Sequence, residues 1–118
     1  SIEATSIIFD EIDTGVSGRV SQRMAEKMYQ LGVGSQVLCI SHLPQTTALA
    51  DTNLLISKEI IDKRTLTVIR ELTEEQKIAE VARMVSGDTM TKLSEEHSIE
   101  MLRLAEKTKE EIKEKLNK

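Results

Sequence analysis

The sequence is poor in the residue types that mark several common classes of protein. Its 118 residues include no Trp, one Cys and one Pro, and aromatic residues make up 2% of the chain. The two rings, Phe9 and Tyr29, are too few for the base-stacking surface that single-strand nucleic-acid binders use. A lone Cys39 excludes both a disulfide framework and a cysteine-cluster metal site. Its place in an apolar run, 37–40, predicts a buried and unreactive thiol.

Long apolar runs and an excess of basic charge are missing as well. No run approaches the roughly 18 residues that a membrane span needs, and the N-terminus lacks the basic-then-apolar order of a signal peptide. We therefore expect a cytoplasmic protein with no membrane partner. The net charge of -4 argues against a free-standing nucleic-acid surface. The length suits one small domain, and the absence of an initiator Met suggests a piece of a longer protein.

What the sequence does contain is an alternation of apolar runs and amphipathic segments. Residues 5–9 form a short apolar run that ends in acids, which is typical of a parallel strand buried on both faces. Apolar residues then recur at helical spacing over 16–31, and Gly32 and Gly34 are predicted to close that helix. A second buried strand is predicted over 35–41. This order predicts a βαβ unit with a right-handed crossover.

A short helix and a hairpin are predicted next. The helix covers 45–50, directly after the proline, which a first helical turn tolerates. Residues 53–58 and 65–72 have the composition of two strands joined around Asp62-Lys63. We expect them to form an antiparallel hairpin at the edge of the sheet.

Two helices are predicted to complete the chain. Thr73 has the spacing of a capping box and opens a helix that ends at Gly87. The last helix begins at Thr91 and becomes almost entirely Lys and Glu after residue 106. Its few apolar residues do not support a coiled coil, so we favour a solvated helical tail. The predicted organisation is an α/β domain over 1–105 and a charged helical tail over 106–118.

Two adjacent carboxylates stand where the first predicted strand stops. Open α/β sheets place ligands outside the carboxyl ends of their strands. Asp10 there could hold Mg²⁺ through water, because this ion prefers few protein carboxylates together with phosphate oxygens and waters. Glu11 would then be free to orient and deprotonate an attacking water. The plain alternative is a strand that ends in two solvated acids.

Small residues and a histidine add to this pattern. Gly15, Ser17 and Gly18 allow a tight backbone excursion with N–H groups exposed near a phosphate, although Ser17 is equally suited to cap the following helix. His42 lies just past the second buried strand, at the same sheet edge as Glu11. Its imidazole could donate to a phosphate or to the attacking water, and the alternative is a structural histidine.

These residues carry a resemblance to a known family. Residues 6–11 (Ser-Ile-Ile-Phe-Asp-Glu) resemble a Walker B strand, 12–17 resemble a D-loop, and 40–42 (Ile-Ser-His) resemble the switch-histidine segment of ABC-type ATPase heads. Transporter-type members usually carry a proline after the acidic pair. The run Asp-Glu-Ile-Asp over 10–13 is instead similar to the SMC-like branch that works on chromosomes.

Longer stretches narrow the resemblance. Residues 9–20, 36–45 and 82–87 resemble the RecN family of bacterial DNA-repair proteins, and the likeness runs through roughly 6–105. It implies an α/β fold, namely the C-terminal lobe of an ABC-type ATPase head. Its strands would be short, mainly parallel and buried, with helices around them and an edge hairpin.

The resemblance also implies roles for the site residues. Asp10 would be the Mg²⁺ acid, Glu11 the general base and His42 the γ-phosphate sensor. Asp13 and Ser17, in the D-loop, would lie near the nucleotide and contact a second head. Gln45 would be a polar neighbour of the site, with a simple role at a helix N-terminus as its alternative.

Other parts of an ABC-type head do not occur in this sequence. A P-loop of the form G-x-x-x-x-G-K-[ST] and a Ser-Gly-Gly signature are both missing. The resemblance therefore implies that ATP and Mg²⁺ bind in a full-length parent and that the isolated chain is inactive. The implied partners are the N-terminal lobe of the same head, a second head in an ATP-sandwiched homodimer, and DNA through the full-length protein.

The function that the resemblance implies is ATP hydrolysis in DNA double-strand-break repair and recombination, in a cytoplasmic, nucleoid-associated protein. Two other functions stay open. The chain could be an ATPase lobe of a membrane transporter, or a non-catalytic module that dimerises or holds a partner lobe through apolar faces.

Overall fold

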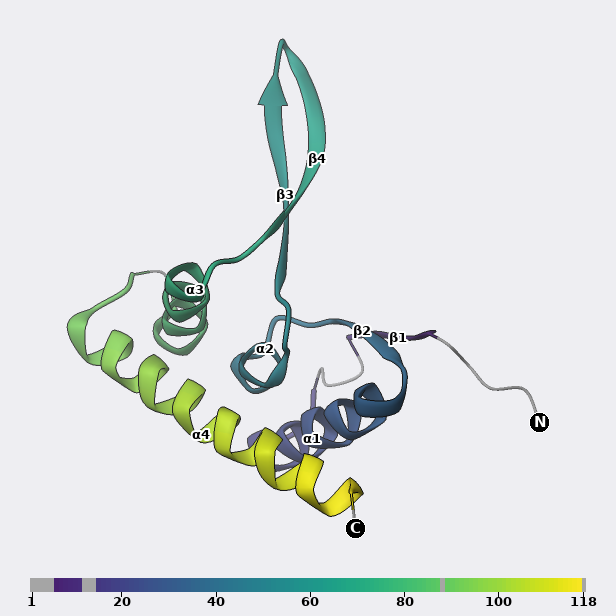
Figure 1. Ribbon diagram of the computed structural model, residues 1–118. Coiled ribbons are helices and arrows are strands. Elements are labelled where there is room, and N and C mark those ends of the chain that lie inside the picture. Colours follow the sequence, from purple (N-terminus) through teal and green to yellow (C-terminus); the bar gives the residue numbers. More distant parts are fainter. Residues whose placement is uncertain (1–5, 12–14, 88, 118) are drawn as a thin grey trace.

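The computed structural model describes residues 6–11, 15–87 and 89–117. Within these ranges the chain forms a mixed α/β structure with a two-stranded parallel sheet, a two-stranded antiparallel sheet and four helices. The parallel sheet and the helices form the body of the molecule, and the antiparallel hairpin extends away from it (Figure 1).

The predicted βαβ unit is confirmed. Strand β1 (Ser6–Asp10) and strand β2 (Gln36–Ile40) pair in parallel, and helix α1 (Gly18–Gly34) connects them. The register places Asp10 beside Ile40. The carboxyl ends of the two strands therefore lie at one edge of the sheet, as the sequence predicted.

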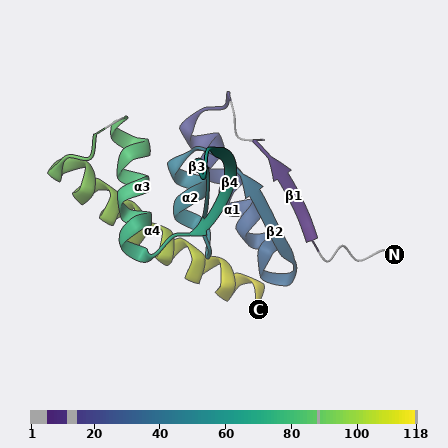
Figure 2. The ribbon, with the colours of Figure 1, turned by 90° about the horizontal axis from the view of Figure 1, so that it is seen from above.

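The expectation that both faces of these strands are buried is wrong. Along each strand, exposed and half-buried residues alternate. Ile8, Leu38 and Ile40 are 68%, 44% and 49% exposed. Helix α1 contacts β2, and no described element covers the opposite face of the sheet. Strand β1 lies at the edge of this two-stranded sheet (Figure 2). Because parallel sheets are normally covered on both faces, this exposed apolar face is unusual.

Helix α2 (Pro44–Leu49) lies in the centre of the helical body. It contacts α1, α3 (Glu74–Ser86) and α4 (Lys92–Leu116). Its residues Thr47, Ala48 and Leu49 are buried, and Ala48 and Leu49 belong to the hydrophobic core. The proline takes the first turn, as expected. A six-residue helix would not persist alone, so packing on three sides holds it.

The predicted hairpin is confirmed, but its predicted place at a sheet edge is wrong. Among the described residues, strands β3 (Leu54–Ile61) and β4 (Arg64–Glu71) pair only with each other. Asp62 and Lys63 have φ of 50° and 65°, the left-handed pair that a tight two-residue turn requires. The hairpin stands clear of the helices in Figure 1. A lone two-stranded sheet is marginal in water, so the hairpin gains little stability from its own pairing.

The two last helices begin and end largely as the sequence predicts. The Thr73 side chain accepts from the Gln76 N–H while the Gln76 side chain accepts from the Thr73 N–H, which completes the capping box. Gly87, with φ of 96°, ends α3. Helix α4 continues without a break past residue 106, and Lys109 is only 3% exposed. The expectation of a fully solvated tail therefore fails at Lys109.

The exposed hairpin predicts self-association of the isolated chain. Ile56 and Ile69 lie directly opposite each other and are 59% and 60% exposed, and exposed apolar edge strands pair with other chains. The double variant Ile56→Thr/Ile69→Thr should sediment more as a monomer at high concentration, with an unchanged helical circular dichroism signal. Thr67→Val, on the same face, should increase association. If neither variant changes the sedimentation profile, the hairpin is not the contact surface.

Candidate functional site

The candidate site lies at the carboxyl edge of the parallel sheet. The N–H of Glu11 donates to the carbonyl of Ile40 at 2.8 Å, which extends the ladder one residue beyond β1. The Glu11 side chain thereby comes level with the residues that follow β2. Its Oε1 lies 3.5 Å from Nδ1 of His42. The structure thus brings together the residues proposed as base and phosphate sensor.

The backbone of Glu11 is unusual. Its φ of 49° lies in the left-handed region, which residues other than glycine enter at a cost of about 1–2 kcal/mol. Such backbone strain is often found at functional sites, where the surrounding structure holds it in place.

The site is open to solvent. The side chains of His42 and Glu11 are 64% and 54% exposed. At this exposure an ion pair contributes at most about 1 kcal/mol to stability. The geometry is therefore not explained by a stabilising interaction between the two side chains.

The remaining candidate residues have different positions. Asp10 is exposed at the end of β1. The side chain of Ser17 accepts a hydrogen bond from the N–H of Val20 at 3.3 Å, so Ser17 is the N-cap of α1, the alternative role that the sequence offered. Gln45 is half-buried, and its Nε2 lies 3.8 Å from the position that a Cβ on Gly18 would occupy. Asp13 lies outside the described residues.

Gln45 therefore connects α2 to the start of α1. Its Oε1 is buried and has no hydrogen-bond partner in the structure. Ser17 precedes the glycine that Gln45 approaches, so the structure links Gln45 to the end of the predicted D-loop.

The carboxylates of the candidate site could bind a cation only together with ligands from outside the described residues. Among the described residues there is no group of three or more His, Cys, Asp or Glu side chains that could hold a metal. Asp10 is an exposed carboxylate of the kind that Mg²⁺ accepts when phosphate oxygens and waters complete its coordination. The residues thus fit a magnesium ion that arrives with a phosphate ligand.

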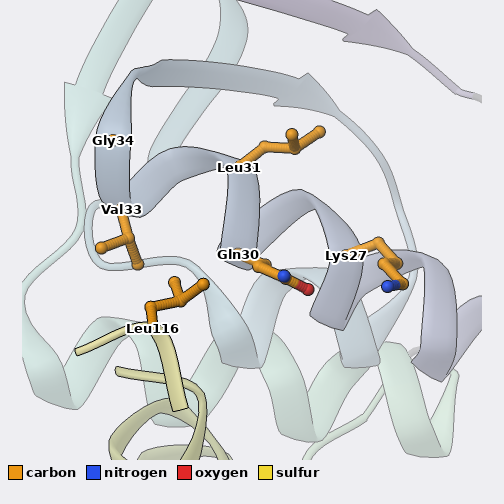
Figure 3. A pocket seen from close by; sticks show the side chains of 6 residues that line it. All are labelled: Lys27, Gln30, Leu31, Val33, Gly34 and Leu116. Carbon is orange, nitrogen blue, oxygen red and sulfur yellow. The ribbon is translucent and has the colours of Figure 1, made fainter. Parts of the chain in front are cut away.

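A pocket elsewhere on the molecule does not coincide with this site. It has a volume of about 540 Å³ and lies between the C-terminal ends of α1 and α4, lined by Lys27, Gln30, Leu31, Val33, Gly34 and Leu116. Figure 3 shows Val33 and Leu116 on facing sides of it. Neither Glu11 nor His42 lines this pocket, so the candidate chemistry does not depend on it.

Sequence reasoning missed a cluster at the far end of α2. Lys109 and Lys77 both donate to the carbonyl of Ala50. The helical spacing of α4 could have indicated this cluster. Lys109 follows Ala105 by four residues and therefore lies on the same inward-facing side of the helix. Its position within a run of charged residues hid that signal.

None of the helices in the described part of the chain is long and apolar enough to cross a membrane.

Comparison with known proteins identifies the family. The chain is 52% identical over 107 residues to the DNA repair protein RecN of Bacillus subtilis, a match that covers 91% of this chain and 19% of that protein. It is 58% identical over 101 residues to RecN of Halalkalibacterium halodurans, which covers 86% of this chain and 18% of that protein. The chain belongs to the RecN family.

A more distant relative agrees with this result. RecN of Rickettsia conorii is 40% identical over 99 residues, which cover 84% of this chain and 18% of that protein. No family model matches the chain. The chain spans about a fifth of the length of these RecN relatives.

The left-handed backbone at Glu11 gives a stability test. Glycine adopts φ of 49° without a Cβ clash, so Glu11→Gly should be about 1 kcal/mol more stable than Glu11→Ala. Urea denaturation of both variants measures the difference. Gly18→Ala serves as a control, because Gly18 is helical and alanine should be the more stable residue there. Equal stability of the two Glu11 variants would contradict the strained geometry.

Proposed function

We propose that this chain is part of the ATP-binding and ATP-hydrolysing head of a RecN-type DNA-repair protein. The observation that carries the proposal is the 3.5 Å approach of Glu11 to His42 at the carboxyl edge of a parallel sheet. It supports the proposal because ligands of open α/β sheets bind at that edge. The similarity to proteins named DNA repair protein RecN supports the repair branch over a transporter lobe.

In this proposal each residue has a separate task. Glu11 takes the proton of the water that attacks the γ-phosphate, and His42 donates a hydrogen bond to that phosphate or water. Asp10 binds Mg²⁺, which neutralises phosphate charge when it is bound. The left-handed φ of Glu11 supports this division, because the backbone at Glu11 departs from the extended conformation of the strand that carries Asp10.

The exposed apolar face of the parallel sheet supports the proposal that this chain binds partners. The exposed face that carries Ile8, Leu38 and Ile40 suits the N-terminal lobe of the same head, which would bring the P-loop. Such a layer would also exclude water from the solvent-open pair of Glu11 and His42, where electrostatic stabilisation then gains strength. In the same proposal a second head meets residues 13–17, and DNA binds through the full-length protein in the cytoplasm.

A second candidate function is a binding module without chemistry. The exposed sheet face and the free hairpin favour it, because both have the character of interfaces. For the isolated chain the two candidates agree: neither predicts ATP turnover. They separate in the full-length protein, where only the first predicts an effect of Glu11 on catalysis.

The division of labour between the two acids can be tested in a full-length RecN protein that carries this segment. Glu11→Gln should lower ATP turnover by about 10²- to 10⁴-fold and preserve ATP binding, because the amide keeps the shape but takes no proton. Asp10→Asn should instead weaken Mg²⁺-dependent nucleotide binding. Steady-state turnover and nucleotide titration with and without Mg²⁺ measure both. An equal loss of binding in the two variants would contradict the assignment.

His42 is tested against a structural role. If it contacts the γ-phosphate or the attacking water, His42→Ala should lower turnover per folded molecule by about 10²- to 10³-fold and leave ADP affinity unchanged. Its 64% exposure predicts only a small change in melting temperature. Turnover, melting temperature and separate ADP and ATP affinities measure these effects. A variant with normal turnover but lower stability would return His42 to a structural role.

A further inference from the structure

Two lysines hold the C-terminal end of helix α2. The carbonyl of Ala50, the residue that ends this helix, accepts from Nζ of Lys77 at 2.7 Å and from Nζ of Lys109 at 3.1 Å. Lys77 comes from α3 and Lys109 from α4. The last carbonyls of a helix have no partner within it, and the negative end of the helix dipole attracts cations. The two lysines therefore satisfy this end of α2 and fix it to both neighbouring helices.

Lys109 is an unusual residue to find in this position. Its side chain is only 4% exposed, while the carboxylates that pair with it, Asp51 and Glu106 at 3.2 Å each, are 70% and 68% exposed. The ring of Tyr29 lies 5.7 Å from its Nζ. Burial of an ammonium group costs free energy unless several partners compensate.

The second lysine makes the cluster more costly. Burial, together with the charge of Lys109, lowers the pKa of Lys77 below its usual range. Two ammonium groups at one carbonyl repel each other, and the carboxylates of Asp51 and Glu106 offset part of this repulsion. An apolar pair of the same size would avoid the burial of charge. In some proteins a buried charged group of this kind is retained because it specifies one arrangement of the chain.

A chain of hydrogen bonds runs from Asn53, three residues after Ala50, to the candidate site. Asn53, just beyond the cluster, donates through Nδ2 to the carbonyl of Thr47 at 3.0 Å. The N–H and the hydroxyl of Thr47 both donate to the carbonyl of Leu43, at 3.1 and 3.0 Å. The N–H of Leu43 donates to Oγ of Ser41 at 3.1 Å. Ser41 and Leu43 are the residues on either side of His42.

Helix α2 therefore connects two sites: the lysines hold its C-terminal end, and His42 lies just before its N-terminal end. It has six residues and is packed against α1, α3 and α4, so it offers little room to bend between Ala50 and Leu43. A shift of the C-terminal end moves the whole helix, and with it the backbone that presents His42 to Glu11.

We infer that Lys109 and Lys77 are positioning residues for His42 that act through helix α2. The catalytic relevance of this inference rests on the proposed function, but the structural coupling does not. Removal of Lys109 should displace the His42 ring relative to Glu11 and leave the fold intact. Methionine is the suitable replacement, because it fills the same volume without the buried charge.

The first arm of the test uses this chain itself. The proton–nitrogen correlations of the His42 ring and its nuclear Overhauser contacts with Glu11 are recorded for the wild type, Lys109→Met and Lys113→Met. Lys113 is a matched control, since its Nζ also lies over the Tyr29 ring, at 6.0 Å, one turn further along α4. His97, on α4, is an internal reference. We expect Lys109→Met to shift the His42 signals and weaken its contacts with Glu11, while Lys113→Met and His97 show no change.

The second arm uses a full-length RecN protein that carries this segment. Lys109→Met should lower kcat for ATP hydrolysis by about 2- to 30-fold, the range of energetic coupling between linked sites, and leave KM for ATP unchanged. Lys113→Met should retain wild-type turnover. If Lys109→Met does not fold, Lys77→Met removes the other donor to Ala50 and is tested in the same way.

The outcomes are distinct. A folded Lys109→Met chain with unchanged His42 signals overturns the inference. If Lys109→Met shifts the His42 signals of this chain, but turnover of the full-length protein does not depend on Glu11 or His42, the positioning role is supported and the proposed function is rejected. Shifted signals together with lower kcat in the full-length protein support both.

Discussion

The parallel pairing of β1 with β2 is the constraint on which the candidate site depends. In a parallel pair both strands end at the same edge, and the register of Asp10 beside Ile40 places those ends level. The bond from the Glu11 N–H to the Ile40 carbonyl carries the alignment one residue further. A slip of one residue would turn every side chain of β1 to the opposite face and separate Glu11 from His42.

The same sheet explains why the molecule has so much open apolar surface. In the part of the chain that the structure describes, helix α1 contacts β2, no helix contacts β1, and the strands of the hairpin pair with each other alone. The chain spans about a fifth of its RecN relatives, so a large part of those proteins has no counterpart here. The helical body is different, because α2 is enclosed by α1, α3 and α4 and forms a small complete core. The site lies at the boundary between this closed body and the open sheet.

Local signals in the sequence were reliable wherever a short-range interaction determines the structure. The capping box at Thr73, the proline in the first turn of α2, the glycine at the end of α3 and the turn at Asp62-Lys63 each form within a few residues. Long-range features were less predictable. An apolar strand does not reveal whether a second layer will cover it, so Ile8 was expected to be buried and is 68% exposed. A charged helix does not reveal its neighbours, so Lys109 was expected in solvent and is buried against α2.

By itself, the sequence determined the order of strands and helices, the acidic pair after the first strand and the histidine after the second. These follow from hydrophobic periodicity and from side-chain chemistry close in sequence. Only the tertiary structure decided that Glu11 lies 3.5 Å from His42, that Gln45 approaches the start of α1, and that Lys77 and Lys109 converge on Ala50. The physical reason is that these contacts depend on how separate elements pack, and packing joins residues whose separation in the sequence carries no local signal.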